Sequence, residues 1–118
     1  MKIEDVINRK ELAERLDGDM ELYRELAELF IEDSQKLMNN IMGAIKEKDA
    51  DKLRKYAHTI KGSVSNFSAQ AAYDAAFELE NMGRNSEMDK AEQAFEALKD
   101  KIQQAREAMQ LLMKEKEL

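Results

Sequence analysis

The residues best suited to chemistry gather around the only histidine of the chain, His58. At about 100° per residue in a helix, Arg54, Lys61 and Ser65 lie on the same face as His58. The apolar positions of this segment centre on the opposite side, so this face is expected to meet water. An exposed imidazole is a nucleophile as well as a base. A lysine one turn further on can hold the oxygens of a phosphoryl group attached to that imidazole.

Gly62 stands beside this cluster, and glycine is unusual at such a helical position. A glycine inside a helix is less favourable than alanine by about 1 kcal/mol, and this position requires no left-handed backbone. The missing side chain next to an exposed imidazole lets another protein approach closely, which favours a reaction inside a partner's site. Between Lys52 and Tyr73 the chain has four basic residues and no acidic residue, which predicts a local positive patch.

The composition predicts that helices position these side chains. Proline is absent, 4 of the 118 residues are glycine, and strong helix formers dominate. Start and stop signals divide the chain into five helical segments: residues 8–17, 20–47, about 49–67, 68–83 and 91 to near the C-terminus. Asn8, Asp19 and either Asp49 or Asp51 are expected to cap the first three segments. Apolar stripes and short connections favour a single domain over residues 1–118. We expect an all-α antiparallel four-helix bundle with a short additional N-terminal helix.

Local signals also predict helix ends and buried faces. Ser68 is expected to open the fourth segment, Gly83 to end it in a left-handed conformation, and Ser86 to cap the last segment. Met38 and Met42 lie beside the apolar stripe of the second segment, where they either complete the core or form an adaptable docking surface. That stripe, which we expect in the core, comprises Leu22, Leu26, Leu29, Phe30, Leu37, Ile41 and Ile45.

The charge and the missing residue types disfavour several classes of function. The chain has 19 Lys+Arg against 25 Asp+Glu, a formal net charge of −6, and no cysteine. This balance disfavours nucleic acid and membranes as partners, and the lack of cysteine fits a reducing, cytoplasmic location. The sequence contains no glycine-rich phosphate-binding loop, so we do not expect the chain to use ATP by itself. No carboxylate is evident that would orient His58 as in a catalytic triad. We expect a monomer with no metal site and no cofactor of its own.

Two short segments carry a further pattern. Residues 57–63 read AHTIKGS and are followed by Asn66, and residues 79–84 read LENMGR. Together with the region of Phe30 and the five-helix plan, these segments resemble histidine-containing phosphotransfer (HPt) domains over most of the chain. The resemblance implies that His58 accepts a phosphoryl group, that Lys61 stabilises it, and that Gly62 provides clearance for a partner.

The resemblance also implies partners and flanking residues. In HPt domains an exposed histidine accepts a phosphoryl group from the aspartate of one response-regulator receiver domain and passes it to another, in two-component signal transduction. A hybrid sensor histidine kinase is a further expected partner, and magnesium is expected on the partner receiver. Glu80 and Arg84 resemble residues that flank the histidine, and Arg54 and Ser65 are further candidates from the helical wheel.

Departures from the family pattern occur at Ser68, Ala72 and Val64, where they concern packing and interhelical distance. Two alternatives remain open beside the phosphorelay carrier. The first is a non-catalytic helical-bundle scaffold that binds another protein through its basic patch and final heptad stripe. The second is the phosphoaccepting input domain of a chemotaxis-type histidine kinase, which receives its phosphoryl group from an ATP-binding domain.

Overall fold

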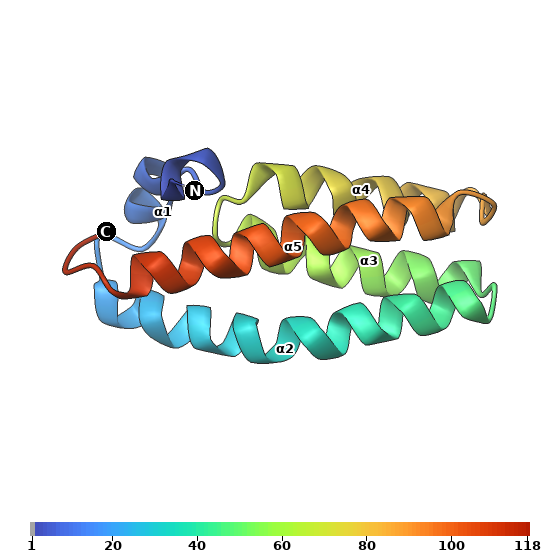
Figure 1. The fold of residues 1–118 in the computed structure, drawn as a ribbon, viewed down its shortest axis with the longest axis horizontal. Helices are drawn as coiled ribbons and strands as arrows, with labels where there is room; N and C mark the ends of the chain where they lie inside the picture. The colour runs from blue at the N-terminus through green and yellow to red at the C-terminus, as the bar shows by residue number, and fades with distance from the viewer. Residues whose placement is uncertain (1) are drawn as a thin grey trace.

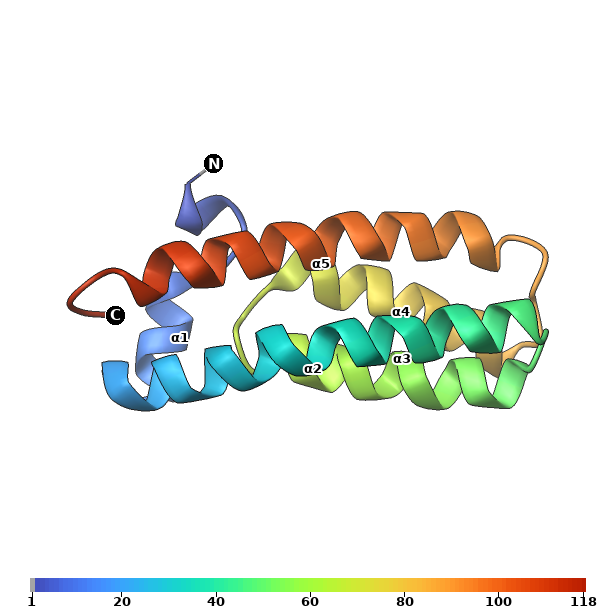
Figure 2. The ribbon, with the colours of Figure 1, turned by 60° about the horizontal axis from the view of Figure 1, so that its bottom comes forward.

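Helices account for the architecture of residues 2–118, the part of the chain that the computed structural model describes. A short 3-10 helix, η1 (Ile3–Asp5), and α1 (Arg9–Arg15) precede four longer helices: α2 (Met20–Lys46), α3 (Ala50–Ser65), α4 (Gln70–Arg84) and α5 (Ala91–Met113). Figures 1 and 2 show α2 to α5 side by side along the long axis, with α1 near the end where the C-terminus also lies. The predicted all-α four-helix bundle with a short additional N-terminal helix is confirmed.

Short polar side chains begin the first three α-helices. Asn8, Asp19 and Asp49 each accept a hydrogen bond from the backbone N–H three residues further on, at 3.0–3.1 Å. Each bond satisfies a donor that the first turn of a helix leaves without an intrahelical partner. These starts agree with the prediction, because a cap depends on residues that are adjacent in the chain.

The boundaries of α4 and α5 differ from the prediction at three positions. Ser68 lies one residue before the N-cap of α4, has a φ of 55°, and donates from Oγ to Glu11 Oε1 at 2.8 Å. Gly83 lies inside α4, and the left-handed residue beyond the helix is Ser86, with a φ of 55°. Ser86 therefore follows the end of α4 and does not cap α5, whose N-cap residue, Lys90, makes no side-chain cap.

The buried face of α2 is rotated from the predicted stripe. Leu29 is 55% exposed and Leu22 is also exposed, so the prediction that both lie in the core is wrong. Met38 is buried, which places it in the core and not on a free docking surface, while Met42 is partly buried. The buried residues of α2 are Met20, Tyr23, Ala27, Phe30, Ser34, Met38, Ile41, Ala44 and Ile45. The small residues Ala27 and Ser34 are buried on this face, whereas Leu22 and Leu29 lie beside it.

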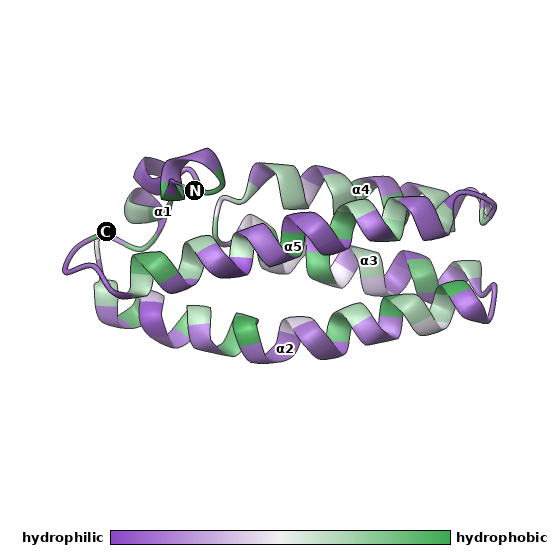
Figure 3. Cartoon of the chain, viewed as in Figure 1, coloured by the Kyte–Doolittle hydropathy of each residue, from purple (hydrophilic) through white to green (hydrophobic). Residues whose placement is uncertain are grey.

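The polar and apolar residues alternate around each long helix, as Figure 3 shows. This pattern is typical of helices that bury one face against their neighbours and expose the other to water. Within residues 2–118, no helix has the combination of length and apolar composition that crossing a membrane requires.

Gly83 allows α3 and α4 to pack closely near the site. A Cβ atom at this position would lie 2.6 Å from Arg54 N and 2.7 Å from Ala50 O, which are both backbone atoms of α3. Real Cβ atoms do not approach so closely, so only glycine fits without movement of a helix. The glycine that we expected to terminate α4 is therefore required for helix packing.

Candidate functional site

His58 lies on the outer face of α3, and its side chain is 65% exposed. The expectation that His58 meets water is confirmed. The side chain that hydrogen-bonds to it comes from α4, which packs beside α3. The imidazole therefore stands at the junction of two helices, with one edge toward protein and the other toward solvent.

Glu80 supplies the contact on the protein side. Its carboxylate is buried, with 3% of the side chain exposed, and Oε2 lies 3.1 Å from His58 Nδ1. We expected no carboxylate that would orient the histidine, and that expectation is wrong. The signal for Glu80 was its position on the inward face of α4, between the buried residues Leu79 and Gly83.

Two further cations share the Glu80 carboxylate. Lys61 Nζ lies 2.6 Å from Oε1, and Arg84 donates from a terminal nitrogen to Oε2 at 2.9 Å. The same guanidinium donates to Asn81 Oδ1 at 2.7 Å. The i,i+4 ion pair that Glu80 and Arg84 allow is therefore present, and the structure joins it to His58 and Lys61. One buried carboxylate holds three basic side chains in place, which offsets the loss of its own hydration.

These contacts determine the ionisation of Glu80. Burial raises the pKa of the Glu80 carboxyl, but the hydrogen bonds and charge interactions with Lys61 and His58 together outweigh burial and hold the pKa below its ordinary value. Glu80 is thus a carboxylate at neutral pH and can only accept hydrogen bonds. We infer that neutral His58 carries its hydrogen on Nδ1, because that nitrogen faces the carboxylate. The lone pair then lies on Nε2, the other ring nitrogen.

The remaining predicted site residues do not contact His58. Arg54 pairs with Asp51 at 3.1 Å, and Ser65 Oγ donates to the Gly62 carbonyl at 2.7 Å. Asp51 also pairs with Lys55 at 3.2 Å, so the predicted basic patch is partly neutralised by an acidic residue just before it. Gly62 itself is exposed, and a Cβ atom there would have no atom within 4 Å. The space beside Gly62 is open, as the clearance hypothesis requires.

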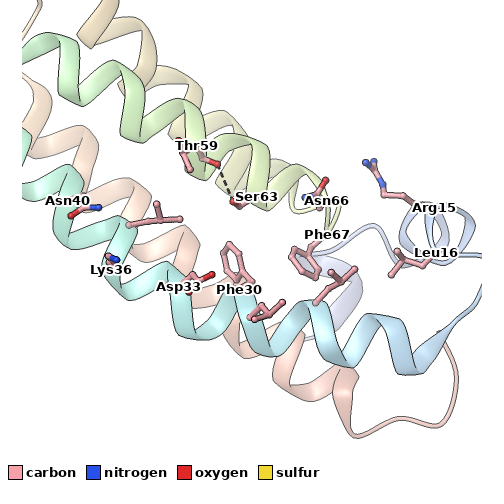
Figure 4. Close-up of a pocket in the computed structure, with 13 residues that line it drawn as sticks. Arg15, Leu16, Phe30, Asp33, Lys36, Asn40, Thr59, Ser63, Asn66 and Phe67 are labelled. Carbon is pink, nitrogen blue, oxygen red and sulfur yellow. Dashed lines mark hydrogen bonds between the residues drawn. The ribbon is translucent and has the colours of Figure 1, made fainter.

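A groove between α2 and α3 lies on the other flank of His58. Figure 4 shows Thr59 and Ser63 on α3, Asn66 at its C-terminal end, and Phe30 and Phe67 between the ribbons of α2 and α3. Exposed Leu29 belongs to the same groove, whose volume is about 680 Å³. Leu29, one of the two leucines for which the stripe prediction failed, thus lines an apolar surface beside the candidate site.

Replacing Glu80 with glutamine should destabilise the protein in a pH-dependent way. At pH 7 we expect Glu80→Gln to lower the free energy of unfolding by about 1.5–3 kcal/mol, because the buried charge that holds Lys61, Arg84 and His58 is removed. The pKa of Glu80 is lower in the folded protein than in the unfolded chain. The stabilisation of the fold by the charged carboxylate is therefore fully present above the unfolded-state pKa, and it is lost as the pH falls through the folded-state pKa.

Urea unfolding at pH 7 and pH 3 measures this difference. The difference in unfolding free energy between wild type and Glu80→Gln should be smaller at pH 3, which lies below the unfolded pKa of a glutamate side chain, so part of the stabilisation by the charged carboxylate is lost there. Glu78→Gln, an exposed substitution on the same helix, should show little change at either pH. A gap of equal size at both pH values would contradict the assignment of Glu80 as an ionised, hydrogen-bonded carboxylate.

Comparison with known proteins places this geometry in a family. The family described as Hpt domain matches residues 25–108, so the chain belongs to the Hpt domain family. The crystal structure of histidine-containing phosphotransfer protein B from Pseudomonas aeruginosa superposes with a TM-score of 0.83 and 26% sequence identity. That alignment covers 89% of this chain and 91% of the other. A comparison with curated protein sequences gives no match.

Family membership supports a phosphotransfer role in signalling, with phosphorelay partners such as receiver domains and kinases. It also agrees with the resemblance that the two sequence segments showed.

Proposed function

We propose that this protein is a phosphorelay intermediate in which His58 accepts a phosphoryl group from a receiver-domain aspartate, or from a sensor kinase, and passes it to another receiver. The observation that carries the proposal is the contact between His58 Nδ1 and the buried carboxylate of Glu80, at 3.1 Å. This contact leaves Nε2 as the nucleophilic nitrogen on an exposed side chain.

The transfer balances without any movement of a proton. The lone pair of His58 Nε2 attacks phosphorus in line, the N–P bond forms, and the P–O bond to the partner's aspartate breaks to release a carboxylate. The imidazole keeps its hydrogen on Nδ1 and becomes positively charged, and Glu80 stabilises that charge. In the second transfer a receiver carboxylate attacks phosphorus, and Nε2 leaves with the electron pair.

Lys61 and Gly62 have separate roles in the proposed reaction. Lys61 stands one turn after His58 and neutralises phosphoryl charge, whereas Gly62 leaves room for the receiver that brings the aspartate. We propose that the receiver supplies the magnesium ion, since the leaving and attacking carboxylates are its own. The groove that contains Leu29 and Phe30 is the proposed apolar contact for the receiver, because it adjoins the exposed face of α3.

Lys61→Ala should shorten the lifetime of the phosphohistidine and slow its transfer. Loss of a charge-assisted contact to the phosphoryl oxygens corresponds to about a tenfold effect. The decay of the phosphorylated protein, followed by intact mass, measures the lifetime. Circular dichroism should show unchanged helicity, and Lys46→Ala, an exposed substitution at the end of α2 and outside the groove, serves as the control. Equal decay and transfer rates for wild type and Lys61→Ala would refute this role.

The relay itself is tested with receiver domains. The protein is phosphorylated on His58, separated from the donor, and mixed with isolated receiver domains in the presence of magnesium. We expect the phosphoryl group to move to a receiver aspartate and, in the reverse reaction, to return to His58. A scaffold would bind a partner with no exchange. An input domain of a chemotaxis-type kinase would acquire its phosphoryl group only from an ATP-dependent kinase domain.

A further inference from the structure

The ammonium group of Lys61 is surrounded by more than its ion pair with Glu80. Nζ lies 4.9 Å from the centroid of the Phe77 ring and 5.8 Å from that of Tyr73. Both distances are within the range in which a cation is attracted to the face of an aromatic ring. The Lys61 side chain is only 15% exposed, although His58, one turn earlier, is 65% exposed.

The two rings and the carboxylate share one face of α4. Tyr73, Phe77 and Glu80 are separated by four and three residues, which places them along a single stripe of the helix. The rings lie against each other with centroids 6.3 Å apart and planes inclined by 42°. This stripe offers the ammonium of Lys61 a negative charge at one end and two aromatic rings beside it.

We propose that Tyr73 and Phe77 form an aromatic seat that holds the Lys61 ammonium on the α4 side of the site, and that Phe77 thereby controls how readily Lys61 reaches a phosphoryl group on His58. The inference rests on the proposed function, in which Lys61 stabilises that group. Phe77 is a positioning residue in this account, since it acts through Lys61.

The seat opposes the movement that stabilises phosphohistidine. A phosphoryl group on Nε2 brings up to about two negative charges to the solvent side of the imidazole. Nδ1, the opposite ring nitrogen, faces Glu80. To pair with the phosphoryl oxygens, the ammonium of Lys61 has to turn away from the rings of α4. The attraction between the ammonium and these rings therefore favours the seated position of Lys61.

Substitutions of Phe77 distinguish an attraction between the Lys61 ammonium and an aromatic ring from mere contact with an apolar side chain. Phe77→Leu keeps an apolar side chain but removes the ring quadrupole, whereas Phe77→Tyr keeps the ring. Phe77 is 41% exposed, so neither change creates a core cavity. Leu111, which is also 41% exposed but lies on α5, provides a matched control as Leu111→Ala.

The experiment measures the lifetime of phosphohistidine in the isolated protein, after phosphorylation with phosphoramidate and removal of the donor. We expect Phe77→Leu to lengthen the lifetime by about two- to fivefold, the effect of removing a partly exposed cation–aromatic interaction. Phe77→Tyr and Leu111→Ala should decay as wild type does. In a Lys61→Met background, Phe77→Leu should leave the phosphohistidine lifetime unchanged, because the ammonium group that the rings hold is absent.

Four results would overturn the proposal that Tyr73 and Phe77 hold Lys61. The first is an unchanged or shorter lifetime in Phe77→Leu. The second is an equal change in the leucine and tyrosine variants, and the third is an effect that persists in the Lys61→Met background. A change confined to transfer to a receiver would identify Phe77 as a partner contact, which also overturns the proposal.

Acylation of the unphosphorylated protein distinguishes failure of the seat from failure of the proposed function. Limited treatment with acetic anhydride, followed by peptide mass analysis, measures the reactivity of each lysine. Phe77→Leu should raise the rate at Lys61 by about two- to fivefold, and Phe77→Tyr should not. If wild type takes up no phosphoryl group, the relay proposal fails, while this reactivity still decides whether the seat exists.

Discussion

Gly83→Ala should lower the free energy of unfolding by about 1–3 kcal/mol and, at the same time, disturb the contact between Glu80 and His58. The added Cβ would meet Arg54 N at 2.6 Å and Ala50 O at 2.7 Å. Both atoms belong to the backbone of α3, so no side-chain rotation relieves the clash. The helices have to move apart, and Glu80 lies on α4 one turn before the glycine.

Gly43→Ala provides the matched control for this substitution. Gly43 lies inside α2, and a Cβ there would have no atom within 4 Å. Alanine should therefore stabilise the protein by about 0.5–1 kcal/mol through its higher helix propensity. Urea unfolding measures both effects, and phosphorylation by phosphoramidate reports on the site. Equal stability of Gly83→Ala and wild type would show that the close approach of α3 and α4 is not required.

Gly62→Gln should slow phosphoryl exchange with a receiver by at least about tenfold, while phosphorylation by phosphoramidate changes by less than about twofold. The space beside Gly62 is open in the isolated protein, so the longer side chain fits without a clash. It would occupy the volume that a receiver needs to bring its aspartate to His58. A small donor does not need that volume.

The stability of Gly62→Gln distinguishes impaired docking from impaired folding. Glutamine is a better helix former than glycine, so the variant should be slightly more stable than wild type. Gly43→Gln makes the same change at a position remote from His58 in the sequence and should leave exchange unaffected. Wild-type exchange by Gly62→Gln would refute the clearance role, and a parallel loss with phosphoramidate would indicate damage to the site itself.

Helix positions and starts were largely predictable because they depend on neighbours in the chain. The caps at Asn8, Asp19 and Asp49 required only a short polar side chain three residues before a free N–H. The errors at Gly83 and Ser86 arose from tertiary packing. A glycine near a helix end normally signals a left-handed terminator, but here α3 requires the glycine, and a serine adopts the positive φ.

The exposed leucines of α2 show a second limit of periodicity. Leu22 and Leu29 fall close enough to the buried stripe that hydrophobicity alone assigns them to the core. The actual stripe includes the small side chains Ala27 and Ser34, which a hydrophobic pattern does not favour. Which of two adjacent stripes is buried depends on the neighbouring helices, so the sequence of α2 alone cannot decide it.

In the candidate site, too, the sequence predicted what one helix determines and missed what depends on packing between helices. His58, Lys61 and Gly62 lie within five residues of one helix, so spacing predicted their common face. The contacts of Glu80 depend on the packing of α4 against α3, and the helical wheel of α3 contains no information about them. For this reason a carboxylate that reaches His58, Lys61 and Arg84 was predicted only as a flanking residue. The contacts of Lys61 with Tyr73 and Phe77 were missed for the same reason.

The central claim is that His58 carries the phosphoryl group, and intact mass spectrometry after treatment with phosphoramidate tests it most directly. Wild type should gain the mass of one phosphoryl group, and acid should remove it, as expected for a phosphoramidate bond. His58→Ala, which changes an exposed side chain and should remain folded, should show no gain. Folded wild-type protein that takes up no phosphoryl group, or an equal gain in His58→Ala, would contradict the account.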